Sequence, residues 1–279
     1  MSESTRRVRV VRSDDTHVED LVAIEEPLEI RLGFLHRGLH GQKSVSITMR
    51  TPGSDAELAV GFLVGEGILR EPGNVREVRH CGSEEEGREN RNVVRVELAE
   101  GVDVDLGRLQ RNFYTTSSCG VCGKTSLDAL AIQGIDPVAA QWTVASSLIS
   151  SLPGALRERQ RVFEQTGGLH AAALFGRDGT LLDVREDVGR HNAMDKVVGA
   201  SFLAGALPLD EHVLLLSGRA SFELLQKALA AGIAVVAAVG APSSLAVELA
   251  DTFGITLLGF VRDGRFNCYT HADRLAGER

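Results

Sequence analysis

Residues 213–244, VLLLSGRASFELLQKALAAGIAVVAAVGAPSS, hold the pattern that decides the fold of the C-terminal half. Two segments in this stretch, Leu214–Leu216 and Ala234–Ala237, are continuously apolar. Such runs are typical of strands in a sheet that is covered on both faces. Between them, a serine that can cap a helix opens the segment Ser221–Ala230, which is predicted to be helical. Strand, helix and strand in this order predict a layered α/β domain.

The same pattern continues on both sides of this stretch. Downstream, Ser243–Phe253 is predicted to be a helix and Ile255–Phe260 a strand, followed by a hairpin that turns at Asp263-Gly264. Upstream, the predicted elements are two helices, a hairpin and a long helix, over residues 143–151, 154–164, 169–184 and 187–204.

The first third of the chain has a different character, because its apolar segments are short and alternate with polar positions. One helix is predicted over residues 54–68, with Ser54 or Asp55 as its cap. The predicted strands are residues 7–12, 21–24, 28–32, 43–50, 75–79 and 93–98. We therefore divide the chain into an N-terminal β-rich lobe, residues 1–130, and an α/β domain, residues 131–279.

Composition and charge exclude several classes of protein. The 279 residues are 43% hydrophobic and 24% charged, which suits a globular chain with a sizeable core. The net charge of -8 argues against broad binding to nucleic-acid phosphates. No apolar run reaches the roughly 18–20 residues of a membrane helix, and no apolar segment of a signal peptide follows Arg6-Arg7. With only four cysteines, we expect a cytoplasmic protein with reduced thiols.

The segment Ser117–Lys124, SSCGVCGK, places two cysteines three positions apart in a polar loop. Its glycines let the backbone turn tightly and leave the thiols accessible. Disulfide exchange, metal ligation and relay of sulfur as a persulfide all suit such a pair. A structural zinc site needs about four ligands and a second Cys-x-x-Cys is absent, so we predict no permanently bound metal. The two isolated cysteines, Cys81 and Cys268, are predicted to be small buried residues on strands.

Polar segments of the predicted α/β domain favour the binding of an anion. Residues 185–196, REDVGRHNAMDK, place an arginine, a histidine and an asparagine after a glycine at a predicted helix start. Ser217–Ser221 and Gly240–Ser244 each follow an apolar strand and open a helix. Ligands collect beyond the carboxyl ends of strands in such sheets, and helix amides favour phosphate. His170, at the start of a strand, is either a structural histidine or part of this site.

Together these segments resemble the FdhD/NarQ family, the formate dehydrogenase accessory sulfurtransferases. The resemblance covers roughly residues 20–272, and GRHNAMDK at residues 189–196 is its most specific part. Residues 33–43 depart from the short turn that is usual there. The resemblance implies a cytidine-deaminase-like α/β fold without the zinc residues of a deaminase. The matching stretches are residues 49–69, 117–123, 166–172, 186–197, 217–223 and 259–271.

The resemblance also implies a function, which is to carry sulfur from a cysteine desulfurase to the molybdenum (or tungsten) bis-guanine-dinucleotide cofactor of formate dehydrogenase. Cys119 would hold the sulfur as a persulfide, and Cys122 would assist its release. Guanine nucleotides should bind as mimics of half of the cofactor, and the family suggests a homodimer. The alternative is a non-catalytic chaperone that only holds the cofactor. The implied cofactor-binding residues are Arg190, His191, Asn192, Lys196, Ser217, Arg219, Ser243, Phe260, Val261, Arg262, Asp263, Gly264 and Arg265.

Overall fold

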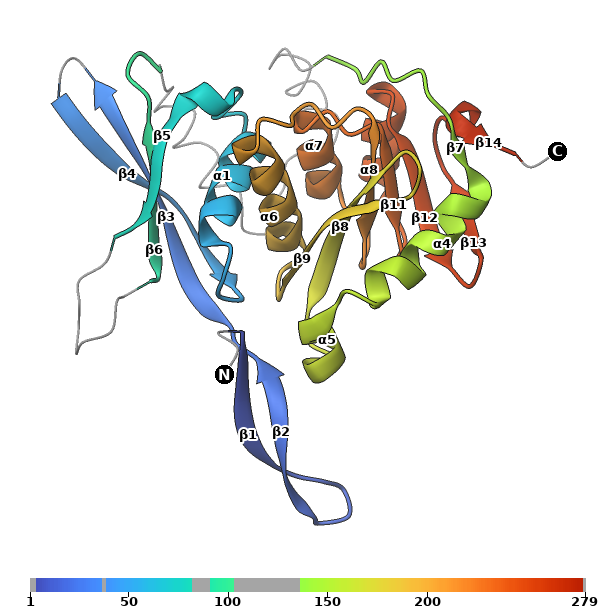
Figure 1. Cartoon of the computed structure of the whole chain (residues 1–279), viewed down its shortest axis with the longest axis horizontal. Helices are drawn as coiled ribbons and strands as arrows, with labels where there is room; N and C mark the ends of the chain where they lie inside the picture. Colours follow the sequence, from blue (N-terminus) through green and yellow to red (C-terminus); the bar gives the residue numbers. More distant parts are fainter. Residues whose placement is uncertain (1–3, 37–38, 82–90, 103–135, 278–279) are drawn as a thin grey trace.

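The computed structural model describes residues 4–36, 39–81, 91–102 and 136–277. It contains two main sheets, and helices α1 and α6 lie between them (Figure 1). A separate hairpin, β1 (Thr5–Val11) and β2 (His17–Ala23), extends away from the body close to the N-terminus. This mixed architecture agrees with the predicted α/β class.

The larger sheet has six strands in the order β13-β12-β11-β10-β8-β9. Strands β10, β11 and β12 are parallel, and β8, β9 and β13 join them by antiparallel pairing. The strands are β8 (His170–Gly176), β9 (Leu181–Asp187), β10 (His212–Leu216), β11 (Val235–Ala238), β12 (Thr256–Arg262) and β13 (Arg265–Cys268). The two apolar runs from which the fold was predicted are therefore neighbouring strands.

Helices cover both faces of this sheet, as the apolar runs predicted. Leu214 and Leu216 of β10 pack in one core with α6, α7 and α8. Val213 and Leu215, which alternate with them, pack in a second core against α4 on the opposite face. The helices are α4 (Ser146–Arg157), α5 (Arg161–Thr166), α6 (Arg190–Leu203), α7 (Phe222–Ala230) and α8 (Ser244–Thr252). A short strand β7 (Val144–Ala145) before α4 pairs with β14 (Leu275–Ala276).

The smaller sheet has four strands in the order β4-β3-β6-β5. Its helix, α1 (Asp55–Gly65), packs against α6, and Leu28, Ile30 and Val94 of the sheet belong to the same core as Val198 of α6. The core is thus continuous between the two sheets, while the predicted boundary near residue 130 lies outside the described residues. The strands are β3 (Glu26–His36), β4 (Leu39–Arg50), β5 (Val75–His80) and β6 (Val93–Leu98). Strands β3 and β4 pair as far as His36 and Leu39, through the segment that departs from the family pattern.

Two helices begin differently from the prediction. Helix α6 begins at Arg190 and not at Asp187, because Asp187 is the last residue of β9 and is fully buried. Ser54 precedes α1 in the left-handed conformation, with a φ of 56°, and its side chain makes no capping hydrogen bond. Asp55 does not cap the helix either, since both of its carboxylate oxygens accept hydrogen bonds from the buried Arg50.

Two predicted helix ends are also wrong. Helix α1 ends at Gly65 instead of Ile68, and Gly67 then turns the chain with a φ of 69°. Helix α4 continues through Pro153, where we predicted a break between two helices. Its buried residues Ile149, Leu152 and Leu156 lie on one stripe against the sheet, so burial of this stripe outweighs the hydrogen bond that the proline cannot donate.

Candidate functional site

The loops predicted to bind an anion meet at one edge of the six-stranded sheet. Because β10, β11 and β12 are parallel, their carboxyl ends lie at the same edge, where β8 begins and β9 ends. Backbone hydrogen bonds join the loops directly. Gly240 N donates to Gly218 O at 2.9 Å, Ser243 N to Ala220 O at 3.0 Å, and Phe260 N to Gly240 O at 3.1 Å. The predicted proximity of these loops is therefore confirmed.

Glycines let the chain segments approach closely at this edge. A Cβ on Gly218 would lie 3.3 Å from His170 Nδ1 and 4.0 Å from Arg190 Cδ, so these three residues from three elements are neighbours. A Cβ on Gly240 would lie only 3.0 Å from the side chain and backbone of Arg219. The backbone amides and the cationic side chains therefore share a small area, as a phosphate site requires.

The first turn of α6 contributes two side chains to this edge. Arg190 Nε is buried and has no hydrogen-bond partner within the part of the chain that the structure describes. His191 Nε2 lies 3.4 Å from Ser221 Oγ and 3.9 Å from Glu223 Oε2. Burial, with the nearby charges of Arg190 and Lys227, lowers the pKa of His191 to about 4. This imidazole is therefore neutral near pH 7 and can accept a proton or a hydrogen bond.

His170 is a second imidazole at this edge, and it lies near Gly218 together with Arg190. Burial lowers its pKa first, and the positive charge of Arg190 lowers it further. An anion bound between these groups would offset the charge of Arg190 and raise the pKa of both imidazoles. The edge thus combines the Arg190 cation with two imidazoles whose pKa values are lowered.

The end of β12, where its pairing with β13 is irregular, adds a flat apolar surface. Phe260 has a φ of 55°, a left-handed conformation that is rare for a bulky residue, and it is 36% exposed. The Arg262 guanidinium lies 5.8 Å from the centre of its ring. Asp263 and Gly264 form the turn with positive φ values. Val261 points the other way into the core beneath α4, so its side chain is not at the surface of the site.

Two residues expected at the site lie inside the protein. Asn192 is buried and donates hydrogen bonds to Met49 O at 2.7 Å and Asp187 Oδ1 at 2.9 Å. Lys196 is 2% exposed, pairs with Asp187 Oδ2 at 2.7 Å and donates to Thr51 O at 2.9 Å. Their position in α6 turns them toward the smaller sheet, while Arg190 and His191 face the edge. Lys196 thus already has a buried counter-charge in Asp187, and its role as a counter-charge for phosphate stays a prediction.

Two serines at the edge have local structural partners. Ser217 Oγ accepts a hydrogen bond from Ala171 N at 2.8 Å, and Ser243 Oγ caps α8 by accepting from Ala246 N at 3.3 Å. Arg219 and Arg265 are exposed.

The sequence analysis assigned no role to Asp187. The segment Asp187-Val188-Gly189 does have the pattern of a turn in which the aspartate side chain accepts a hydrogen bond from the backbone amide two residues later, and Gly189 N makes this bond.

The cysteine pair of the sequence, Cys119 and Cys122, lies outside the described residues. Cys81 and Cys268 are half-buried rather than fully buried, and burial raises the pKa of the Cys268 thiol. Its Sγ donates to Thr270 O at 3.3 Å. Among the described residues, no three His, Cys, Asp or Glu side chains are grouped so that they could hold a metal ion.

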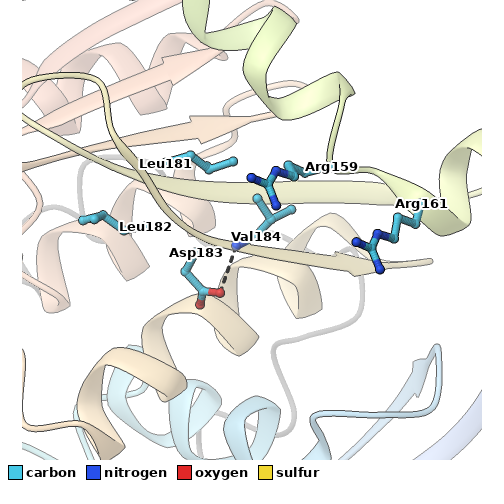
Figure 2. A pocket seen from close by; sticks show the side chains of 6 residues that line it. All are labelled: Arg159, Arg161, Leu181, Leu182, Asp183 and Val184. Carbon is cyan, nitrogen blue, oxygen red and sulfur yellow. Dashed lines mark hydrogen bonds between the residues drawn. The ribbon is translucent and has the colours of Figure 1, made fainter.

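A surface depression of about 270 Å³ lies along β9, lined by six residues that were not predicted as site residues. Figure 2 shows Arg159 and Arg161 beside the strand, with Leu181 and Leu182 toward its beginning. Val184 N donates to Asp183 Oδ1 at 2.9 Å, and Arg185 Nη1 donates to Val184 O at 3.1 Å. Side chains thus bond the backbone groups of Val184 at this edge strand, which protects the sheet from further pairing.

The fold and the edge define the class of this molecule, a two-sheet α/β protein with a candidate anion site. The chain belongs to the FdhD/NarQ family, whose pattern matches residues 23–276. It is 52% identical over 282 residues to the sulfur carrier protein FdhD of Streptomyces coelicolor, covering 99% of this chain and 97% of that one. It is also 52% identical over 279 residues to the sulfur carrier protein FdhD of Mycobacterium tuberculosis, covering 97% of each.

A solved structure has a similar fold. The crystal structure of a Desulfotalea psychrophila protein, provisionally assigned as a formate dehydrogenase accessory protein, superposes with a TM-score of 0.72 over 98% of both chains. The two sequences are 24% identical, so this comparison concerns the fold alone. In the described part of the chain, no helix has both the length and the apolar character needed to span a bilayer.

Proposed function

We propose that this protein is a sulfur carrier that serves formate dehydrogenase by delivering sulfur to its molybdenum bis-guanine-dinucleotide cofactor. Its relatives at 52% identity are named sulfur carrier protein FdhD, and they match almost the whole chain. The single structural observation behind the cofactor half of this proposal is the cationic sheet edge. There Arg190 Nε is buried without a hydrogen-bond partner among the described residues, beside two loops held together by backbone bonds.

The edge suits a guanine dinucleotide for chemical reasons. Phosphate oxygens would accept hydrogen bonds from Arg190 and Arg219 and from the amides at the start of α6. The exposed ring of Phe260, with Arg262 beside it, offers a surface on which a guanine or pterin can stack. Free guanine nucleotides share these groups, so we propose that they bind the same edge.

The sulfur half of the proposal rests on Cys119 and Cys122. The Cys119 thiolate attacks the terminal sulfur of a persulfide on a cysteine desulfurase. A new S–S bond forms on Cys119 while the donor S–S bond breaks, and the donor cysteine leaves as a thiolate. Attack of Cys122 on the inner sulfur of Cys119 then releases sulfide and leaves a disulfide between the two. The two cysteines thus supply the two electrons that reduce the carried sulfur to sulfide. A cellular dithiol then reduces the disulfide and restores both thiols.

The finer predictions from the family belong to the same proposal. We propose a cytidine-deaminase-like layering of the α/β domain, a homodimer, and action in the cytoplasm. A mixed six-stranded sheet covered on both faces by helices is compatible with that layering. A chaperone that only holds the cofactor is the competing function, and it needs the sheet edge but neither cysteine.

The test separates the two functions. Purified protein is incubated with a cysteine desulfurase and L-cysteine, and the mass of the 117–124 peptide is measured. We expect a sulfur adduct in the wild type and in Cys81→Ala, the matched cysteine control, and none in Cys119→Ala. In a strain lacking this protein, Cys119→Ala should fail to restore formate dehydrogenase activity. Full restoration by Cys119→Ala would favour the chaperone and exclude the persulfide role.

A further inference from the structure

The Asp187 carboxylate is the centre of a buried hydrogen-bond network. It is 0% exposed and accepts from four donors. Gly189 N and Asn192 Nδ2 each donate to Oδ1 at 2.9 Å. Thr51 N at 3.1 Å and the Lys196 ammonium at 2.7 Å bond Oδ2. A buried carboxylate with both oxygens satisfied in this way is held in a single orientation.

The donors around Asp187 come from both halves of the fold. Thr51 follows β4 of the smaller sheet, whereas Asn192 and Lys196 belong to α6. Further bonds run along the same seam, since Asn192 Nδ2 donates to Met49 O at 2.7 Å and Lys196 Nζ to Thr51 O at 2.9 Å. Val188 N adds a bond to Thr51 Oγ1 at 3.3 Å. The network therefore joins the end of β4 to the first turn of α6.

The segment that this network fixes carries the side chains of the candidate site. Gly189, Arg190 and His191 lie between Asp187 and Asn192, both of which are anchored. A Cβ on Gly189 would lie 3.1 Å from Asn192 Nδ2, so the turn is also closely packed. Arg190 points away from the network toward Gly218 and His170, and His191 toward Ser221. The direction of both side chains thus depends on the anchor beneath them.

We infer that Asp187 is a positioning residue of the site, which holds the first turn of α6 so that Arg190 meets the anionic part of the ligand. This inference rests on the proposed function. Asp187 itself is fully buried and would not touch the ligand. Its effect on binding must therefore pass through the residues that it orients, chiefly Arg190.

The experiment measures the affinity for guanosine diphosphate by calorimetry in wild type, Asp187→Asn, Arg190→Ala and the double variant. Asn keeps the shape of the side chain but removes the charge opposite Lys196. Val198→Ala, a buried substitution in the same helix away from the network, is the control for lost stability alone. Asn192→Ser removes one donor and keeps the buried carboxylate, so it gives a milder variant if Asp187→Asn does not fold.

Arg190→Ala should weaken binding about tenfold or more, the size of a lost charge-assisted hydrogen bond. Asp187→Asn should weaken it to a similar degree, Asn192→Ser less, and Val198→Ala should bind like the wild type. The double variant should bind no more weakly than Arg190→Ala alone, because two residues that act through one contact are not additive. Additive losses, or wild-type affinity of the folded Asp187→Asn protein, would overturn the inference and leave the proposed function standing. If the wild type binds no guanosine diphosphate, or Arg190→Ala binds it normally, both the inference and the proposed cofactor site are wrong.

Discussion

Replacing Gly61 with alanine should destabilise the protein strongly, because helices α1 and α6 cross there without space for a side chain. A Cβ on Gly61 would overlap the carbonyl oxygen of Asp195 and lie 2.8 Å from Gly199 N. A Cβ on Gly199 would overlap the carbonyl oxygen of Glu57 and lie 2.8 Å from Gly61 N. All of these atoms are backbone, so no side-chain rotation can relieve the contact.

The size of the effect follows from how far the helices must separate. Ordinary contacts of a Cβ begin near 3.4 Å, so relieving the overlap with the Asp195 carbonyl oxygen requires the helices to separate by about 1.6 Å. Helix α1 has 11 residues, which makes it about 16 Å long and about 10 Å wide. Opening this interface by about 1.6 Å creates a void of about 260 Å³, which at about 24 cal/mol per Å³ costs about 6 kcal/mol. For a chain of this size we expect the Tm to fall by about 10 °C.

Thermal and urea unfolding followed by circular dichroism measure this loss. Gly154→Ala is the matched control, because Gly154 is a helical glycine with no atom within 4 Å of its Cβ position. That variant should be more stable than the wild type by about 0.5–1 kcal/mol, the ordinary helix preference of alanine over glycine. If Gly61→Ala and Gly199→Ala each unfold within about 1 kcal/mol of the wild type, the close crossing of α1 and α6 is refuted.

Three further predictions concern charges. The folded protein holds the pKa of His191 at about 4, below its ordinary 6.5, so the unfolded chain takes up this proton first as the pH falls. The neutral His191 therefore contributes fully to stability above pH 6.5, and this contribution is lost as the pH falls from 6.5 to 4. In His191→Gln, the free energy of unfolding plotted against pH should be flatter between these two values. Lys227→Met leaves the buried Asp195, 2.7 Å away in the wild type, without its cation and should cost about 3 kcal/mol at pH 8. This loss of stability should be smaller at pH 5, because the pKa of Asp195 is already raised to about 6 and the carboxyl can be neutral there. An equal loss at pH 5 and pH 8 would contradict this prediction. Arg219→Ala and Arg262→Ala should each weaken binding of guanosine diphosphate by about 1–3 kcal/mol yet leave the sulfur adduct on Cys119 intact, and calorimetry with unchanged affinities would show that the phosphates bind elsewhere.

Local patterns in the sequence were sufficient for much of the fold. The apolar runs of β10 and β11 predicted a sheet covered on both faces, because a strand without polar positions has no side that tolerates water. The loops after these strands were predicted at one edge for the same reason, since parallel neighbours end together. Residues 189–196 were sufficient to suggest the family.

The tertiary structure decided which residues of that segment face the site. Residues 192–199 of α6 are all buried, because α1 packs on one side of the helix and the sheet on the other. A helix buried all round has no apolar stripe, so its sequence cannot reveal which way it is turned. Its orientation is fixed by contacts with distant parts of the chain, at Gly61 and at Thr51. These contacts turn Lys196 inward to Asp187 and leave Arg190 and His191 at the edge, a result that depends on residues more than a hundred positions away.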